Sequence, residues 1–316
     1  MDKKDLKIIE QLQGNARTPF SKIAREVGLS ADSVANRIES LRNKGILGND
    51  FVYINFHKLG YVDYGVYLST VSLSTQTKKE IIDHISGHRN VHYFSETGGS
   101  YNFIIGILAK NPPEFNRILE SLIMPFYQYI YSKEIIIRLN IDQYASLLTA
   151  DEKELLSARF GGSIEDEQLD QQDQIILEHL TKTARAKIIT IANELEMSSS
   201  SVIQRIKSLK SRGIITGYYQ PVNLNSQGYQ VYNLTLSLVL TTNEIHSRLK
   251  SYCQNNPHTR WLIQTMGDWD FELGIEVKDQ KELQKIMDEL KEKVHQIAKI
   301  DFVTIFSQYK YSCYPF

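Results

Sequence analysis

A serine-rich basic stretch at residues 197–213, MSSSSVIQRIKSLKSRG, carries the side chains best suited to bind nucleic acid. Val202, Ile206 and Leu209 recur at i, i+4 and i+7, so they predict a helix with one apolar face. Ser198 can cap its start, and a glycine follows its end. The other side offers cations, hydroxyls and an amide, which suit phosphates and base edges in a DNA major groove. A solvated amphipathic surface helix is the alternative interpretation.

The same pattern occurs earlier, in LSADSVANRIESLRNKG at residues 29–45. Arg37 corresponds to Arg205, and Arg17 to Arg185, so the offset between the matching residues is 168 positions. The matches continue at this offset without a gap along most of the chain. The chain therefore reads as a tandem duplication of a unit of about 145 residues.

Both predicted recognition-type helices present polar groups that could contact DNA. The candidate DNA-binding residues are Ser33, Asn36, Arg37, Ser40, Ser198, Ser201, Gln204, Arg205, Lys207, Ser208, Lys210 and Arg212. Asn36 and Gln204 lie opposite the apolar stripe, and an amide can pair with adenine, whereas the serines near the helix start suit phosphate.

Arg37 and Arg205 flank the apolar stripe, which leaves two interpretations open. Each suits a contact to phosphate or guanine, but each could instead form an ion pair inside its domain, for example with the repeated Glu10 and Glu178. The first copy of the helix also contains acidic residues, whereas the second contains none. The second copy is therefore expected to bind phosphates more strongly.

Composition indicates an ordinary soluble protein of two or more domains. The chain has 316 residues and a formal net charge of −1, so any binding to nucleic acid must come from a local basic patch. Cys253 and Cys313 do not occupy matching positions of the repeat, which argues against a disulfide framework and fits the cytoplasm. No apolar run reaches membrane-spanning length, and the start, MDKKDLKII, does not resemble a signal peptide.

Each copy predicts a helix-turn-helix followed by a βαββαβ segment, an α+β fold. Three helices within some 45 residues predict the first part, and alternating β-branched and aromatic runs predict the strands of the second. One face of such a four-stranded sheet is covered by helices, so the other face needs a partner sheet from the second copy or a second chain. The predicted domains are a helix-turn-helix at 1–50, a ferredoxin-like domain at 51–148, a linker at 149–169, a second helix-turn-helix at 170–217 and a second ferredoxin-like domain at 218–316.

The linker at 149–169 is predicted to be flexible after a short helical start at 149–152. It contains Gly161, Gly162 and Ser163 and then the acidic run 165–167. The acidic run is most simply explained by solubility; the alternative is a strip that covers a basic helix.

The order of these elements resembles the Lrp/AsnC family of feast/famine transcription regulators. The matching residues are Asp5-x-x-Ile8-Ile9, Asn15-Ala16-Arg17, Ile23-Ala24-Arg25-Glu26-Val27-Gly28-Leu29-Ser30, Val34-x-x-Arg37-Ile38-x-x-Leu41 and Lys44-Gly45-Ile46. The resemblance implies binding to double-stranded DNA through the third helix, a fused pseudo-dimer, and association into homo-oligomers through the βαββαβ sheets. It also implies a site for an amino acid or similar small effector, and it implies no cofactor.

The effector loop of the family resembles Gly-Asp-x-Asp-Phe/Leu, and the second copy matches it with Gly267, Asp268 and Asp270. Carboxylates in such a turn can hold an ammonium group or cap backbone amides. The first copy has Ser100 and Asn102 at the acidic positions, so an effector should prefer the second copy. A plain hairpin turn is the alternative.

Two other classes of protein compete with the regulator. Sirohaem decarboxylases share this design, and residues 91–93 and 101–103 faintly resemble their motifs, but an acid-rich tetrapyrrole needs several arginines that the strands do not offer. A ligand sensor without DNA binding is the other. His84, His88 and His92 suggest a metal site only by their spacing, and a solvated helix face explains them more simply. The sequence shows no nucleophile–base constellation and no dinucleotide fingerprint, so we expect no enzyme.

Overall fold

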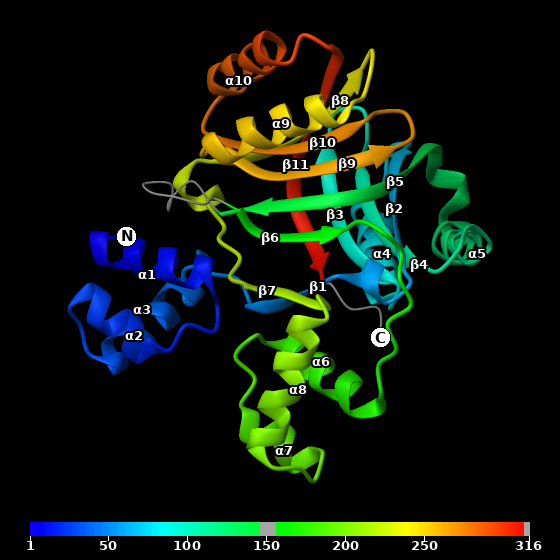
Figure 1. Cartoon of the computed structure of the whole chain (residues 1–316). Helices are drawn as coiled ribbons and strands as arrows, with labels where there is room; N and C mark the ends of the chain where they lie inside the picture. Colours follow the sequence, from blue (N-terminus) through cyan, green and yellow to red (C-terminus); the bar gives the residue numbers. More distant parts are fainter. Residues whose placement is uncertain (146–155, 313–316) are drawn as a thin grey trace.

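The computed structural model describes residues 1–145 and 156–312, and it shows two copies of the expected design in one chain (Figure 1). The first helix-turn-helix unit consists of α1 (Lys3–Gly14), α2 (Phe20–Val27) and α3 (Ala31–Asn43). The second consists of α6 (Gln171–Lys182), α7 (Ile188–Glu194) and α8 (Ser199–Ser211). No helix of the described ranges is long and apolar enough to cross a membrane.

The third helix of each unit begins and packs as its residues predict. Ser30 Oγ accepts a hydrogen bond from the Ser33 N–H at 3.1 Å, and Ser198 does the same for Ser201. Gly28 ends α2 with φ 62°, a left-handed conformation that glycine adopts without strain. The apolar stripes of the third helices are buried against the other helices of their own units.

The extended segments that follow the two units pair with each other. Strand β1 (Phe51–Ile54) and strand β7 (Ile215–Tyr219) form an antiparallel two-stranded ladder in which Phe51 lies opposite Tyr219. The ladder joins the two copies and contacts helices of both helix-turn-helix units.

Each copy continues with the expected βαββαβ order. In the first copy the elements are β2 (Val62–Thr70), α4 (Thr75–Gly87), β3 (Val91–Gly98), β4 (Phe103–Ala109), α5 (Pro112–Ile123) and β5 (Ile130–Tyr144). In the second they are β8 (Gln230–Leu238), α9 (Asn243–Asn255), β9 (Thr259–Met266), β10 (Phe271–Val277), α10 (Gln280–Lys293) and β11 (Ile297–Tyr311).

The two four-stranded sheets close into one barrel. The strand order is β2-β4-β3-β11-β8-β10-β9-β5, and β2 also pairs with β5, so β3–β11 and β5–β9 are the joints between the copies. Helices of each copy pack on the outside of their own sheet (Figure 1). The predicted partner sheet is therefore supplied by the second copy within the same chain, and closure pairs the outer strands with each other, except at the end of β5.

The predicted flexible linker is in part an ordered strand. Residues 149–155, including the expected helical start, lie outside the described residues, as does Cys313. Strand β6 (Leu156–Gly161) pairs with the end of β5. The acidic run is also held in place, because the Glu165 N–H donates to the His57 carbonyl at 2.9 Å and the Glu167 N–H donates to the Lys58 carbonyl at 2.8 Å. The glycines and charges of this segment indicate a loop, but residues 156–161 are ordered because they pair with the free edge at the end of β5.

Candidate functional site

The polar faces of α3 and α8 are exposed in both units. Asn36 and Ser40 of α3 are exposed, and so are their equivalents Gln204 and Ser208 of α8. Lys207 and Lys210 add exposed ammonium groups to α8. Ser33 and Ser201 are half-buried beside the capping serines that begin each helix, where backbone N–H groups point outward. These two faces therefore present amides, hydroxyls and, on α8, cations.

Arg37 and Arg205 bind carboxylates inside their own units. Arg37 Nη1 lies 2.8 Å from Asp2 Oδ2 and 2.7 Å from Asp5 Oδ1. Arg205 Nη1 lies 2.8 Å from both Asp170 and Asp173. The acceptors are thus the aspartates that begin the first helix, and not Glu10 or Glu178. The ion pairs tie the third helix of each unit to the first.

These contacts also change the acidity of the capping aspartates. The pKa of Asp2 is lowered, first by the hydrogen bond that it accepts from the Asp5 N–H and then by Arg37. The pKa of Asp170 is lowered in the same way by the Asp173 N–H and by Arg205. Both carboxylates are therefore ionised at neutral pH and hold their arginines.

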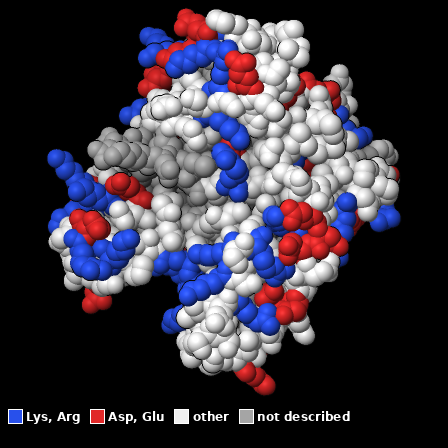
Figure 2. All heavy atoms as spheres, in the orientation of Figure 1, with Lys and Arg blue, Asp and Glu red and all other residues white. Residues whose placement is uncertain are grey.

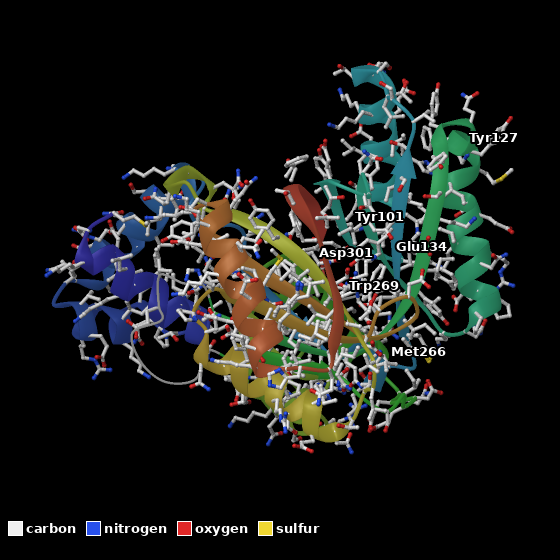
Figure 3. All side chains as sticks on the ribbon, turned by 90° about the horizontal axis from the view of Figure 1, so that it is seen from above. Tyr101, Tyr127, Glu134, Met266, Trp269 and Asp301 are labelled. Carbon is white, nitrogen blue, oxygen red and sulfur yellow. The ribbon has the colours of Figure 1, made fainter. Side chains whose placement is uncertain are left out.

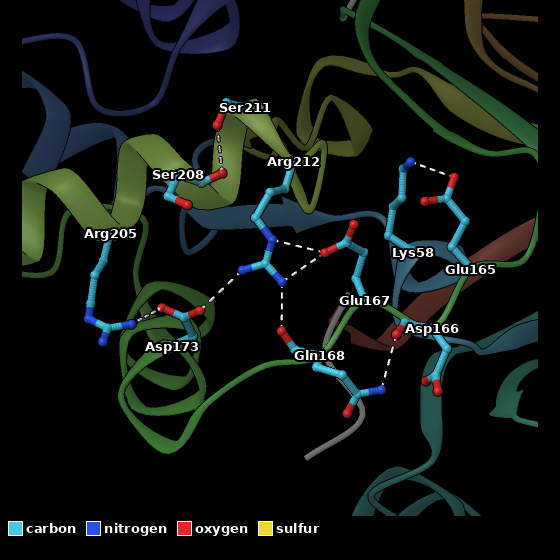
Figure 4. Close-up of polar contacts among 10 residues, drawn as sticks. All are labelled: Lys58, Glu165, Asp166, Glu167, Gln168, Asp173, Arg205, Ser208, Ser211 and Arg212. Atoms are coloured by element: carbon cyan, nitrogen blue, oxygen red, sulfur yellow. Dashed lines mark hydrogen bonds and ion pairs between the residues drawn. The ribbon is translucent and has the colours of Figure 1, made fainter.

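Arg212 is engaged by the acidic run rather than displayed with the polar face of α8 (Figure 4). Its Nε lies 2.9 Å from Glu167 Oε2, its Nη1 3.3 Å from Asp173 Oδ2, and its Nη2 donates to the Gln168 carbonyl at 2.6 Å. A neighbouring ion pair joins Lys58 to Glu165 at 2.5 Å. The acidic run therefore contacts the C-terminal end of α8 and leaves its exposed face uncovered.

The two helix-turn-helix units contact each other through reciprocal hydrogen bonds. Arg17 Nη1 donates to the Ala184 carbonyl at 2.7 Å, and its equivalent Arg185 donates through Nη2 to the Thr18 carbonyl at 2.8 Å. The backbone repeats this relation, because the Ala16 N–H donates to the Tyr218 carbonyl at 3.1 Å and the Ala184 N–H donates to the Asp50 carbonyl at 3.2 Å. The two backbone contacts are equivalent at the offset of 168 residues and indicate a local two-fold relation between the units, whereas the carbonyls that accept from the two arginines differ by two positions.

Four cations meet where the two units approach each other, and we call them the basic band: Arg17, Arg42, Arg185 and Lys210. Figure 2 shows Lys and Arg side chains gathered in this region. Burial is the main cause that lowers the pKa of Arg185 and of Lys210, and neighbouring arginines lower both pKa values further. The buried Asp50 accepts a hydrogen bond from Arg42 at 2.8 Å. Only Lys210 of this band was among the residues proposed from the sequence; the repeated Arg17 and Arg185 were the signal that could have found it.

The loop predicted to bind an effector forms a tight turn between β9 and β10. Gly267 has φ 151°, where a side chain would be strained. Asp270 accepts hydrogen bonds from the Leu238 N–H and the Thr241 hydroxyl, both at 2.7 Å. Asn102 of the first copy caps the Thr70 N–H in the same manner. Asp270 therefore caps backbone at the end of β8, the second of the two roles that its position suggested.

Asp268 lies at the same end of the barrel in a group of acidic and aromatic side chains. Its carboxyl group raises the pKa of Glu134, chiefly through a shared hydrogen bond. Figure 3 shows Glu134 near Trp269, Tyr101 and Asp301 at this end. The carboxyl group of Asp268 thus interacts with Glu134, whereas that of Asp270 caps the backbone.

A central cavity of about 580 Å³ lies inside the barrel and extends toward the segments that lead to the helix-turn-helix units. Its polar lining includes Asp63, Tyr67, His92, Arg138, Gln143, Asn233, Arg260, Glu272 and Glu276. Residues 47–48 and 221–225 line its outer part. Sequence reasoning weighed only His92 of this lining, as a possible metal ligand and in the motif at 91–93, because the lining residues come from six different strands of both copies.

His92 lies in the barrel, apart from the two histidines with which its spacing suggested a common site. It is 4% exposed on β3, and its Nε2 lies 2.9 Å from Asp63 Oδ1, so the expectation of a solvated helix face was wrong for this residue. His84 lies on α4 and His88 at its end, away from the barrel interior. The part of the chain that the structure describes contains no group of three side chains suited to hold a metal ion.

Arg138 forms the centre of the charged lining. Its Nε and Nη2 donate to the two carboxylate oxygens of Glu272 at 3.3 and 3.2 Å, and its Nη1 lies 3.7 Å from Asp63. Burial alone would raise the pKa of Asp63, but His92 and Arg138 outweigh it, so the pKa of Asp63 is lowered. On the other side, Arg260 contacts Glu276 at 3.5 Å and the Tyr219 hydroxyl at 3.2 Å.

Comparison with known proteins identifies the helix-turn-helix segment that begins each half of the chain. Residues 1–42 match the AsnC-type helix-turn-helix domain, and residues 169–216 match a winged helix-turn-helix DNA-binding domain. The regulator LrpA of Pyrococcus horikoshii is 32% identical over 43% of this chain and 91% of its own length. The regulatory protein AsnC of Haemophilus influenzae is 27% identical over 39% of this chain and 81% of its own length.

A solved structure extends the fold comparison to the whole chain. The siroheme decarboxylase NirDL aligns over 99% of this chain and 94% of its own with a TM-score of 0.63, at 13% sequence identity. At that identity the likeness concerns the fold of the duplicated architecture. With its two helix-turn-helix matches and its similarity to LrpA along nearly the whole length of that regulator, the chain belongs to the Lrp/AsnC family.

Proposed function

We propose that the chain is a sequence-specific DNA-binding transcription regulator whose two helix-turn-helix units bind two half-sites from a single chain. The observation that supports this most is the reciprocal contact between the units, in which Arg17 and Arg185 each donate to a carbonyl of the other unit. That contact, with the β1–β7 ladder, holds α3 and α8 in a defined relation. Two recognition helices related by a two-fold axis match an operator with two related half-sites.

The proposed contacts divide into base readout, phosphate contacts and positioning residues. Asn36 and Gln204 are the candidates for base readout, because their amides stand exposed at equivalent positions. The candidates for phosphate contacts are Ser33, Ser40, Ser198, Ser201, Lys207, Ser208 and Lys210, together with Arg17 and Arg185 of the basic band; Arg42 of the band is paired with Asp50. Arg37, Arg205 and Arg212 act as positioning residues, because carboxylates of the protein already engage them.

The two half-sites are proposed to be bound with unequal strength. Lys207 of α8 stands where α3 has Glu39, so the second unit presents more positive charge to phosphates. A protein of this kind selects an imperfectly palindromic operator, with the stronger half-site under α8.

The experiment that tests the proposal is selection of genomic fragments by the full chain across a salt series. The expected result is a split site, with an affinity that falls linearly with the logarithm of salt concentration. Asn36→Ala and Gln204→Ala should each weaken one half-site, whereas Gln284→Ala on the distant α10 serves as the matched control. Retention of no fragment at low salt would overturn the proposal.

The further family expectations, an amino-acid effector and oligomers, have less support from the geometry. Asp270 already accepts two hydrogen bonds, which leaves Asp268 to hold an ammonium group. The inner faces of both sheets are already closed against each other within the chain, so any association of chains needs other surfaces.

A decarboxylase of tetrapyrroles is the second candidate, because a solved structure of NirDL with an iron-uroporphyrin III analogue shares this fold along the chain. The cavity lining fits such a ligand poorly. Arg138 and Arg260, which would bind ligand carboxylates, are each paired with a glutamate, and the lining adds Asp63. Titration with iron uroporphyrin III distinguishes the two candidates: a shift of its absorbance bands at micromolar protein would favour the enzyme.

A further inference from the structure

The lining of the central cavity differs between the two copies at equivalent positions. At the offset of 168 residues, the equivalent pairs are Asp63 and Val231, His92 and Arg260, and Ile104 and Glu272. Arg138 and Ile305 are equivalent by strand register, since Arg138 lies opposite Asp63 and Ile305 lies opposite Val231. In three of these four pairs, a charged residue in one copy corresponds to an apolar residue in the other. One asymmetric site occupies the barrel, where a symmetric dimer would carry two equivalent half-sites.

Fixed negative charges outnumber fixed positive charges in this lining. The carboxylates are Asp63, Glu272 and Glu276, and the guanidinium groups are Arg138 and Arg260; each of these residues is at least nine-tenths buried. Both guanidinium groups already contact a glutamate. The lining therefore carries one more carboxylate than it has guanidinium groups.

Asp63 is the carboxylate of this lining that can accept a further donor, because Arg138, which already binds Glu272, approaches it only to 3.7 Å. The residue is fully buried, its Oδ1 accepts from His92, and among the described residues its Oδ2 has no hydrogen-bond partner. Buried polar atoms are nearly always paired, and leaving one unpaired costs about 1–3 kcal/mol in general. Because Asp63 lines the cavity, a donor within the cavity would remove this cost.

Aromatic rings form much of the remaining wall. Tyr93, Phe160, Tyr219 and Trp261 line the same cavity as Asp63. The Trp261 ring packs directly on Gly274, and a Cβ atom at residue 274 would lie only 2.2 Å from the ring. The Trp261 Nε1 donates to Asn233 Oδ1 at 3.0 Å, which fixes the ring in place. The volume falls in the range of small-molecule sites.

We propose that the cavity binds a small organic cation, a protonated amine on an apolar body, with the ammonium group at Asp63 and the body against the aromatic wall. Ammonium groups bind both to carboxylates and to the faces of aromatic rings. An anionic ligand would meet guanidinium groups that are already paired and three carboxylates that repel it. The site differs in place from the loop at 267–270, which lies at the end of the barrel.

The test is calorimetric titration of the full chain with phenethylamine and with 3-phenylpropionate, two ligands of similar size and opposite charge. The amine should bind with a dissociation constant of about 1 mM or below, as the usual efficiency of small ligands allows, and the acid should bind at least about tenfold more weakly. Binding should also shift the emission of Trp261.

Variants then place the amine in the cavity. Asp63→Asn should weaken the amine at least about tenfold, which corresponds to about 1.4 kcal/mol. Should that variant fail to fold, Glu276→Gln replaces it, with the same direction of change. Asp288→Asn, an exposed carboxylate of α10, is the matched control and should leave binding unchanged.

Three results would overturn the proposal. The first is equal binding of the acid and the amine. The second is amine binding that neither cavity variant changes. The third is no heat with phenethylamine or with the longer cation spermidine, which would mean that water alone satisfies Asp63. None of these measurements uses DNA, so they do not depend on the proposed regulator.

Discussion

The two helix-turn-helix units and the barrel interior arose from the same duplication but have diverged to different degrees. In the units, equivalent residues still make similar contacts: Arg37 and Arg205 bind equivalent aspartates, and Arg17 and Arg185 each donate to a backbone carbonyl of the other unit. In the barrel, Arg138 binds Glu272, while their equivalents are Ile305 and Ile104. The pseudo-symmetry between the two copies is therefore retained in the helix-turn-helix units and lost in the lining of the barrel.

The difference indicates what each region faces. Under the proposed function, a double helix offers two related half-sites, so equivalent contacts remain useful in both units. A single cavity on the axis between the copies has no second half to match, and a fused chain allows each copy to supply a different charge. A homodimer could not place one arginine opposite one glutamate across its axis without repeating the pair.

The largest effect is expected from breaking the asymmetric pair in the barrel. Arg138→Met leaves Glu272 and Asp63 buried without their cation, so the free energy of unfolding should fall by about 3–5 kcal/mol. Urea denaturation of the full chain measures it. Lys299→Ala removes an exposed pair with Asp301 and should change stability by about 1 kcal/mol or less. Similar losses in both variants would contradict the special role of the interior pair.

A second prediction concerns which half-site each helix-turn-helix unit binds. Gln204→Ala should cost about 1–3 kcal/mol in specific DNA affinity and relax the sequence preference of one half-site. Asn36→Ala should act on the other half-site by the same mechanism. Binding to operators that carry one scrambled half-site assigns each variant to its half. If both variants relaxed the same half-site, the two-unit arrangement would be wrong.

The basic band provides a third test, read from the salt dependence of binding. Arg17→Gln and Arg185→Gln should each reduce the slope of log affinity against log salt by about 1, because each removes one phosphate contact. Filter binding to a selected fragment between low and moderate salt measures the slope. A weakened affinity with an unchanged slope would instead indicate that these arginines only hold the two units together.

The smallest effect concerns the pH dependence of stability. Burial lowers the pKa of His57 from the ordinary value of 6.5, so the folded state binds its proton less readily than the unfolded state. Stability should therefore be highest above pH 6.5 and decline as the pH falls below it. His57→Leu should make this decline shallower, measured by thermal unfolding between pH 8 and 5. His88 and His246, whose pKa values are also lowered, remain in the variant and preserve part of the decline.

Much of the fold could be predicted from local patterns. The spacing of Val202, Ile206 and Leu209 predicted α8, serine and glycine marked its ends, and strand alternation predicted both βαββαβ segments. The need of each sheet for a partner also followed, because a half-covered sheet exposes an apolar face. The order of segments 156–161 was missed, since pairing with β5 depends on a strand edge that the local sequence does not reveal.

The sequence by itself determined the duplication, the element order and the polar faces of the third helices, because these depend on residues that are close together in the chain. Only the tertiary structure decided which charges meet. Asp63, Arg138 and Glu272 are far apart in sequence and converge because the barrel closes through β2–β5 and β5–β9. Likewise, Arg205 pairs with Asp170 and Asp173, and not with Glu178, because the packing of α8 on α6 brings these two carboxylates to it. Residue spacing specifies the face of an element, whereas its partner across space is set by the packing of the whole chain.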